Sequence, residues 1–337
     1  MEVGNENKRL PYLDYARVFV AYLVIFGHLL PNDDMTIRPY IYAFHMPFFF
    51  LVSGLLHKYD GTVQWRKYVR ILIVPFIFFN VVFFLLKPIL YWNGIWNAPK
   101  SFEYITFAEL ILQYLPMCTK RLITGIDAID GPTWFLVALF WCKIFTDLLK
   151  KWPILWVIYI ALYIVFPLTH HGLIFLRQAC QALPFYFIGF YFKQNCHKIQ
   201  FFPICTKLFL FFLTFWLSVL LTAINGKVSL YATIYGKFPI YVSIWIFYLN
   251  AFLGAFSVLF LSSIFKESNH IKKIAFALIT ILGAQFLFIL SFRKWFGAEL
   301  SVHYIWISLV ILFGCVAIHQ LIEKYIPFIL GKRKEKK

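Results

Sequence analysis

Charged side chains are few in this sequence, and acidic ones are especially scarce. Only 14% of the 337 residues are charged, with 15 Asp and Glu against 32 Lys and Arg. Hydrophobic residues make up 61% of the chain, and the mean hydropathy is +0.74. A soluble domain of this length needs a far more polar surface to stay dispersed. The composition therefore excludes an ordinary soluble protein and indicates a polytopic membrane protein.

The sequence also lacks the cysteine and charge patterns of two other classes. Its six cysteines form no CxxC pair or other metal-ligand spacing, and most fall in apolar runs, so free buried thiols and no metal site are expected. The net charge of +17 does not indicate nucleic acid, because the basic residues are spread among short loops. The expected partner is instead the lipid bilayer.

About ten apolar runs are long enough to form helices that cross a bilayer, which takes about 20 residues each. They predict an all-α polytopic membrane helix bundle, organised as one domain over residues 1–337. Lys8 and Arg9 precede the first run, which we interpret as a retained anchor rather than a cleaved signal peptide. The runs cover residues 12–31, 39–57, 71–92, 131–149, 153–169, 172–192, 206–224, 239–265, 273–292 and 301–325.

The basic residues between these runs predict the orientation of the bundle. With ten spans and a cytoplasmic N-terminus, most of the Lys and Arg residues outside the spans fall on the cytoplasmic side. Both termini are therefore predicted to be cytoplasmic, in a multi-pass protein of the cell membrane. Residues 93–130 then form the largest outer segment, in which 102–115 suit a surface helix. This segment is either a lid or acceptor-binding element or a passive surface helix.

Two histidines lie inside apolar runs, where a titratable side chain is costly and a functional site is the default hypothesis. His28 is near the end of the first run and His45 is in the second. Because only the short loop 31–38 joins these runs, the two imidazoles are expected at similar depth, in one pocket. The alternative is a pair of interfacial histidines with ordinary hydrogen bonds.

Arg17 shares the first helix with His28. The two are eleven residues apart, which places them on one helix face and roughly 16 Å apart along the axis. Asp14 lies three residues before Arg17 and is positioned to pair with it. Arg17 and His28 therefore either line a polar cavity together, or they are a structural Arg–Asp pair and a separate interfacial histidine.

Three further residues are candidates for substrate binding. Arg66 and Arg70 precede the third run and lie on one helix face, and their guanidinium groups suit phosphate oxygens, although lipid headgroups would also explain them. Trp134 begins the fourth run, where it is either a substrate contact or a tryptophan of the interfacial belt.

Six segments occur in an order that resembles the acyltransferase-3 family of integral membrane acyltransferases, and within it the fucose 4-O-acetylase-like branch. The segments are RLPYLDYARVFVAYLVIFGHLL, IYAFHMPFFFLVSGLL, WRKYVRILIVPF, GPTWFLVALF, ALPFYFIGFYF and IEKYIPFILGKR. They cover nearly the whole chain, and FHMPFFFLVSG with the upstream GH is the most specific part.

The resemblance implies a ten-helix enzyme that takes an acyl group, usually acetyl, from cytoplasmic acyl-CoA. It implies delivery of this group to a hydroxyl of a glycan or lipid-linked sugar at or beyond the membrane. By motif, His28 matches the essential histidine of the first helix and Arg17 the arginine upstream of it. His45 matches the histidine of the second-helix motif, while Arg66 and Arg70 match the basic motif linked to CoA.

One departure from the family pattern concerns the expected acceptor site. Related sequences often have a histidine in the penultimate helix, where this chain reads LGAQFLFILSFRKW, with Gln285 and Arg293 in the corresponding region. The leading hypothesis is a membrane O-acyltransferase with His28 and His45 as catalytic residues and Arg17, Arg66, Arg70 and Trp134 as substrate-binding residues. Its co-substrate would be acyl-CoA, with no metal and no nucleic acid. The alternative is an exporter or transporter of polysaccharide or small solutes with the same fold.

Overall fold

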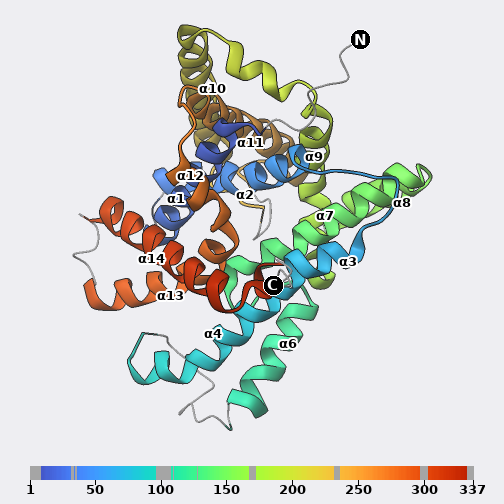
Figure 1. The fold of residues 1–337 in the computed structure, drawn as a ribbon. Helices are drawn as coiled ribbons and strands as arrows, with labels where there is room; N and C mark the ends of the chain where they lie inside the picture. Colours follow the sequence, from blue (N-terminus) through green and yellow to red (C-terminus); the bar gives the residue numbers. More distant parts are fainter. Residues whose placement is uncertain are drawn as a thin grey trace, which may run out of the picture.

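The computed structural model describes residues 9–31, 34, 36–95, 108, 110–126, 128–166, 172–230, 236–296 and 303–331. Within these ranges the regular elements are helices, so the all-α expectation is confirmed (Figure 1). The ten long apolar runs correspond to α1 (Pro11–Leu29), α2 (Ile37–Leu55), α4 (Val74–Trp92), α7 (Trp134–Lys151), α8 (Leu155–Val165), α9 (Leu176–Phe192), α10 (Ile204–Asn225), α11 (Ile240–Ser262), α13 (Leu278–Phe296) and α14 (Tyr304–Tyr325).

Eight helical segments in the described ranges are long and apolar enough to cross a membrane, against the ten spans predicted. The two exceptions are α8, which has 11 residues, and α2, which has 19 residues but is interrupted by polar side chains. An 11-residue helix rises about 16 Å, roughly half of the hydrocarbon thickness. A multi-pass helical membrane protein is thus supported, while spans at α2 and α8 stay predictions.

The third span is longer than expected because three helical pieces follow one another without a break. The short helix α3 (Trp65–Tyr68) leads into the π-helical turn η1 (Val69–Ile73), which continues as α4. In this turn the N–H of Val74 bonds to the carbonyl of Val69, five residues back. Pro75 follows directly and has no N–H to donate, so the helix widens where its regular ladder must be interrupted.

Shorter helices connect or flank the long ones. These are η2 (Leu110–Tyr114), α6 (Leu115–Ile123), η3 (Gly131–Thr133), η5 (Leu173–Phe175), η6 (Cys196–Phe201), α12 (Asn269–Phe276) and η8 (Pro327–Leu330). In Figure 1, α4 and α6 lie at the opposite end of the view from α10, and α13 and α14 lie side by side.

The helix α2 is central to the packing. It lies against α1, α9, α10 and α11, and its closest neighbour is α9. Gly54 of α2 faces the backbone of Tyr186, and Gly189 of α9 faces the backbone of Leu51, so closely that an added Cβ would lie 2.0 Å from a carbonyl oxygen in each case. Small residues at the crossing therefore let the two backbones touch.

The first helix joins two apolar cores. Tyr12, Ala16 and Val20 belong to a large cluster with α2, α7, α9 and α11. Val18 and Ile25 belong to a second cluster with α13 and α14. The helix therefore buries two faces, and its end near His28 is held between α2 on one side and α13 on the other.

Candidate active site

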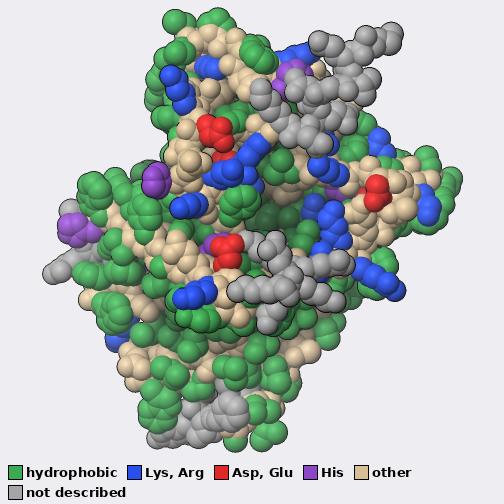
Figure 2. Space-filling view, viewed as in Figure 1, with side chains coloured by type: hydrophobic (Ala, Val, Ile, Leu, Met, Phe, Trp, Pro, Cys, Tyr) green, Lys and Arg blue, Asp and Glu red, His purple; other side chains and the backbone are tan. Residues whose placement is uncertain are grey.

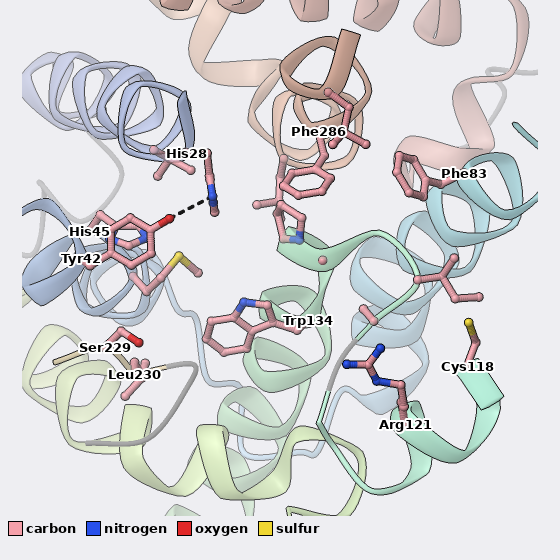
Figure 3. Close-up of a pocket in the computed structure, with 18 of the residues that line it drawn as sticks. His28, Tyr42, His45, Phe83, Cys118, Arg121, Trp134, Ser229, Leu230 and Phe286 are labelled. Atoms are coloured by element: carbon pink, nitrogen blue, oxygen red, sulfur yellow. Dashed lines mark hydrogen bonds between the residues drawn. The ribbon is translucent and has the colours of Figure 1, made fainter. Parts of the chain in front are cut away.

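A cavity of about 590 Å³ lies between the ends of several helices (Figure 3). His28 of α1, His45 of α2 and Trp134 of α7 all line it. These three predicted site residues are up to 106 positions apart in the sequence, and the fold brings them together. Trp134 is buried against the rings of Phe135 and Phe175, rather than exposed as a belt residue would be.

His28 contacts Tyr42 across the gap between the first two helices. Its Nδ1 lies 3.0 Å from the Tyr42 hydroxyl, and a guanidinium nitrogen of Arg38 donates to the same hydroxyl at 3.3 Å. If the hydroxyl accepts from Nδ1–H, the lone pair of a neutral His28 is on Nε2; if it donates, Nε2 carries the hydrogen. Tyr42 therefore decides which atom of His28 can act as a base.

The tautomer of His45 is fixed by the backbone. Its Nδ1 lies 2.8 Å from the carbonyl oxygen of Ile41, one helical turn earlier. A carbonyl can only accept, so Nδ1 must carry the hydrogen and a neutral His45 has its lone pair on Nε2. The side chain is 4% exposed, and Nε2 has no hydrogen-bond partner among the described residues. His45 thus offers a proton-accepting nitrogen at the cavity wall.

Three cations also line the cavity, and the sequence reasoning did not select them. They are Arg38 of α2, Lys87 of α4 and Arg121 of α6. Lys87 is 2% exposed, with its Nζ 4.8 Å from the Phe83 ring centre and 5.0 Å from that of Tyr114. A lysine inside the apolar run FFLLKPIL was the available signal, since intramembrane charges usually mark functional sites.

The predicted outer segment supplies one wall of this cavity. Tyr114, Met117, Cys118 and Arg121 of η2 and α6 line it, and Figure 3 shows Cys118 and Arg121 on the opposite side from His28 and Tyr42. Half of the surface helix predicted at 102–115 lies outside the described residues. The described part of the segment is therefore a wall of the site.

The departure in the penultimate helix has a structural role. Arg293 of α13 donates to the carbonyls of His28 at 2.6 Å and Leu30 at 3.2 Å. These carbonyls belong to the end of α1, where no further helical N–H is available. Gln285 is buried without a hydrogen-bond partner among the described residues, and it does not line the cavity.

Three predicted binding residues lie elsewhere. Arg17 pairs with Asp14, which also accepts from Arg9 at 2.8 Å, near the start of α1. Arg66 is exposed and stacks over the Trp65 ring, with 5.3 Å to its centre. Arg70 is half-buried in η1, and its Nε has no hydrogen-bond partner among the described residues. None of the three arginines lines the cavity.

Figure 2 shows a hollow near the middle of one face, with Lys and Arg side chains gathered around it. In the matching view of Figure 1, α3 and the C-terminal end of the described chain lie on this face. The molecule therefore has a cavity with two imidazoles and a separate basic region. Among the described residues no group of three His, Cys, Asp or Glu side chains could hold a metal ion.

Comparison with known proteins decides the family. A family model described as an acyltransferase domain matches residues 10–320. The chain belongs to this acyltransferase-3 family. Two curated relatives are both named nodulation protein NolL. The protein of Sinorhizobium fredii is 26% identical over 58% of this chain and 51% of its own length, and that of Mesorhizobium japonicum is 28% identical over 57% and 49%.

The chain thus spans about half the length of the curated relatives it matches. No solved structure matches it significantly. Within this acyltransferase-3 chain, the family-like segments gather in two places. The histidine and Trp134 motifs meet at the cavity, whereas the basic motif packs against the C-terminal one, where η1 contacts η8 and Gly331 lies against Ile71.

Proposed function

We propose that this protein is a membrane O-acyltransferase of the cell membrane. It would move an acyl group, most simply acetyl, from cytoplasmic acyl-CoA to a hydroxyl of a glycan or lipid-linked sugar. The observation that carries the proposal is the meeting of His28 and His45, from adjacent helices, in one cavity of a chain that belongs to the acyltransferase-3 family. The cavity volume of about 590 Å³ suits a sugar and the acyl end of a thioester.

The chemistry of the two imidazoles supports this reaction. Transfer from a thioester to an alcohol requires a base for the hydroxyl proton, or a nucleophile that carries the acyl group briefly. We assign one of these roles to His28, through Nε2, with the Tyr42 hydroxyl accepting from Nδ1–H. His45 presents a second lone pair in the same cavity and assists or orients the acceptor. Trp134 would form the wall against which substrate lies.

The arginines at the other end of the molecule would hold the nucleotide end of CoA. Arg66 belongs to α3 and Arg70 to the π-helical turn that follows it, and α3 lies on the face where Figure 2 shows basic side chains around a hollow. Guanidinium groups bind phosphate oxygens in pairs. Arg17 would add positive charge near the start of α1. The extended shape of CoA can then connect this basic region with the cavity, which explains why the two sets of residues are far apart.

Transfer of label in a purified system tests the proposal. The protein is placed in liposomes with acetyl-CoA labelled in its acetyl group and with surface glycan or lipid-linked sugar from cells. Mass spectrometry should show labelled acetyl esters with the wild type and about 10²- to 10⁴-fold slower labelling with His28→Ala. His303→Ala, which changes an exposed histidine at the start of α14, should leave transfer unchanged.

Two results would reject the proposal. Equal labelling by His28→Ala and by the wild type, at equal protein levels, would remove the imidazole from the reaction. Movement of the glycan across the liposome membrane without any acetyl transfer would instead establish the exporter alternative.

A further inference from the structure

A buried polar cluster lies at the ends of α2, α7 and α9, away from the cavity. Its centre is Asp147 of α7, whose side chain is 0% exposed. One carboxylate oxygen accepts from Nε2 of His57 at 3.0 Å, and the other accepts from the Tyr68 hydroxyl at 2.8 Å and from the backbone N–H of Gln64 at 3.3 Å. A buried carboxylate is costly unless it is hydrogen-bonded in this way.

The hydrogen bonds of this cluster have fixed directions. Nε2 of His57 donates to Asp147, so in the neutral imidazole Nδ1 accepts from the Tyr186 hydroxyl at 2.6 Å. Lys143 in turn donates to the Tyr186 oxygen at 3.2 Å. Burial lowers the pKa of His57 below its ordinary value and so favours the neutral imidazole. The hydrogen bond to Asp147 acts in the opposite direction but is the smaller effect. The network therefore links α7 to the end of α2 and, through His57, to α9.

The cluster also fixes the segment that carries the basic motif. Gln64 immediately precedes α3, and Tyr68 ends it, so Asp147 bonds both ends of this short helix. Because α3 is the first turn of the continuous helical segment Trp65–Trp92, its first N–H groups have no partner within the helix, and Asp147 accepts from the one at Gln64. Arg66 and Arg70 flank Tyr68 along the chain. Their placement thus depends on a carboxylate that is more than 70 positions away in sequence.

We infer that Asp147, with Tyr68 and His57, is a positioning group for an anion-binding site formed by Arg66 and Arg70, and that its ligand is the phosphate end of acyl-CoA. The inference rests on the proposed function for the identity of this ligand. Two observations besides the cluster point to a ligand here. The Nε of Arg70 is buried without a hydrogen-bond partner among the described residues, and basic side chains surround a hollow on the face where α3 lies (Figure 2).

The direction of the effect follows from this arrangement. Asp147 and Tyr68 do not line the cavity, so the reacting atoms are not affected directly when these residues change. Loosening α3 weakens only the contact with CoA. The KM for acetyl-CoA should rise by about tenfold, which is the usual scale for one lost hydrogen bond to a charged group, while kcat stays near the wild-type value.

Two variants and one control test the inference in the full chain, purified in lipid nanodiscs. Asp147→Asn removes the charge with little change in shape, and Tyr68→Phe removes only the hydroxyl. Tyr248→Phe is the matched control, because this buried tyrosine of α11 donates to the carbonyl of Gln181 at 2.6 Å, away from α3. For each protein we would measure the Kd for CoA without acceptor, the KM and kcat for acetyl-CoA, and the melting temperature.

The expected result is about tenfold weaker CoA binding and a similarly raised KM in Asp147→Asn, and a smaller change in the same direction in Tyr68→Phe. Tyr248→Phe should bind CoA as the wild type does, even if it melts earlier. Wild-type CoA binding and KM in both test variants would overturn the inference and leave the proposed function intact. A wild type that neither binds CoA nor transfers acetyl would overturn the proposed function and, with it, the ligand named here.

Discussion

The cavity around His28 and the cluster around Asp147 both contain buried histidine and tyrosine, yet their hydrogen bonding differs. In the cluster, both oxygens of Asp147 and both nitrogens of His57 have partners. In the cavity, His28 and His45 each use only Nδ1, and their Nε2 atoms have no partner among the described residues. Saturated polar groups hold structure, whereas groups with an open nitrogen beside empty volume are available for chemistry.

The largest effect expected from this comparison is on kcat, when the unpartnered Nε2 atom of His28 or His45 is removed. Replacing His28 by Ala, or His45 by Asn, should lower kcat by about 10²- to 10⁴-fold, the usual contribution of a positioned acid or base. Asn at position 45 retains an N–H near the Ile41 carbonyl but has no counterpart of Nε2. Acetyl transfer at saturating acetyl-CoA measures the effect, and an unchanged melting temperature shows that the fold is intact. Wild-type kcat in both variants would end the distinction drawn between the two regions.

The next largest effect is expected at the crossing of α2 and α9, since α2 carries His45 and α9 carries Tyr186. Gly54→Ala should destabilise the protein by about 1–3 kcal/mol, because the new methyl group would meet the backbone of Tyr186 and must push α2 from α9. Gly314→Ala is the control, since its nearest neighbour is the Phe288 ring at 3.3 Å, which can shift. Thermal unfolding in nanodiscs compares the two. Equal stability of both variants would show that the crossing tolerates separation.

A smaller effect is expected at the end of α1. Arg293→Met removes a charged donor from the carbonyls of His28 and Leu30 and should cost about 1 kcal/mol. Because these carbonyls hold the turn that carries His28, kcat should fall while the KM for acetyl-CoA stays constant. Lys294→Met, on the neighbouring residue, serves as the control. A rise in KM with unchanged kcat would instead place Arg293 on the donor side.

The smallest effect is a loss of stability at acidic pH. The pKa of folded His57 lies below its ordinary value of about 6.5, chiefly because of burial, so the unfolded chain takes up a proton first as pH falls. This histidine should therefore reduce stability below about pH 6.5, by less than about 1.4 kcal/mol per pH unit. The difference in melting temperature between wild type and His57→Gln, followed from pH 7.5 to 5.5, should show it. A constant difference would contradict a neutral His57 in the cluster.

Local patterns in the sequence are enough to predict the helices and one side of the cavity. Apolar runs define the long helices, because a chain in lipid must satisfy its backbone internally. The short loop between the first two runs places His28 beside the α2 residues around His45. Gly54 has no side chain, which permits the close contact that α9 makes.

The rest depends on contacts between distant segments. Lys87 and Arg121 reach the cavity because α4 and α6 converge on it, and no local pattern specifies that convergence. Asp147 finds His57 across 90 positions, so neither residue is informative alone. Arg17 looks like a partner of His28 from helical periodicity, but its own neighbour Asp14 binds it at the far end of α1.

The glycine crossing of α2 and α9 has one more consequence. Because backbone packs against backbone there, a substitution that separates the two helices would shift α2 as a whole. His45 lies in α2 before this crossing, and His57 lies two residues beyond the end of the helix. A substitution at this crossing would therefore affect both the cavity that His45 lines and the cluster that contains His57.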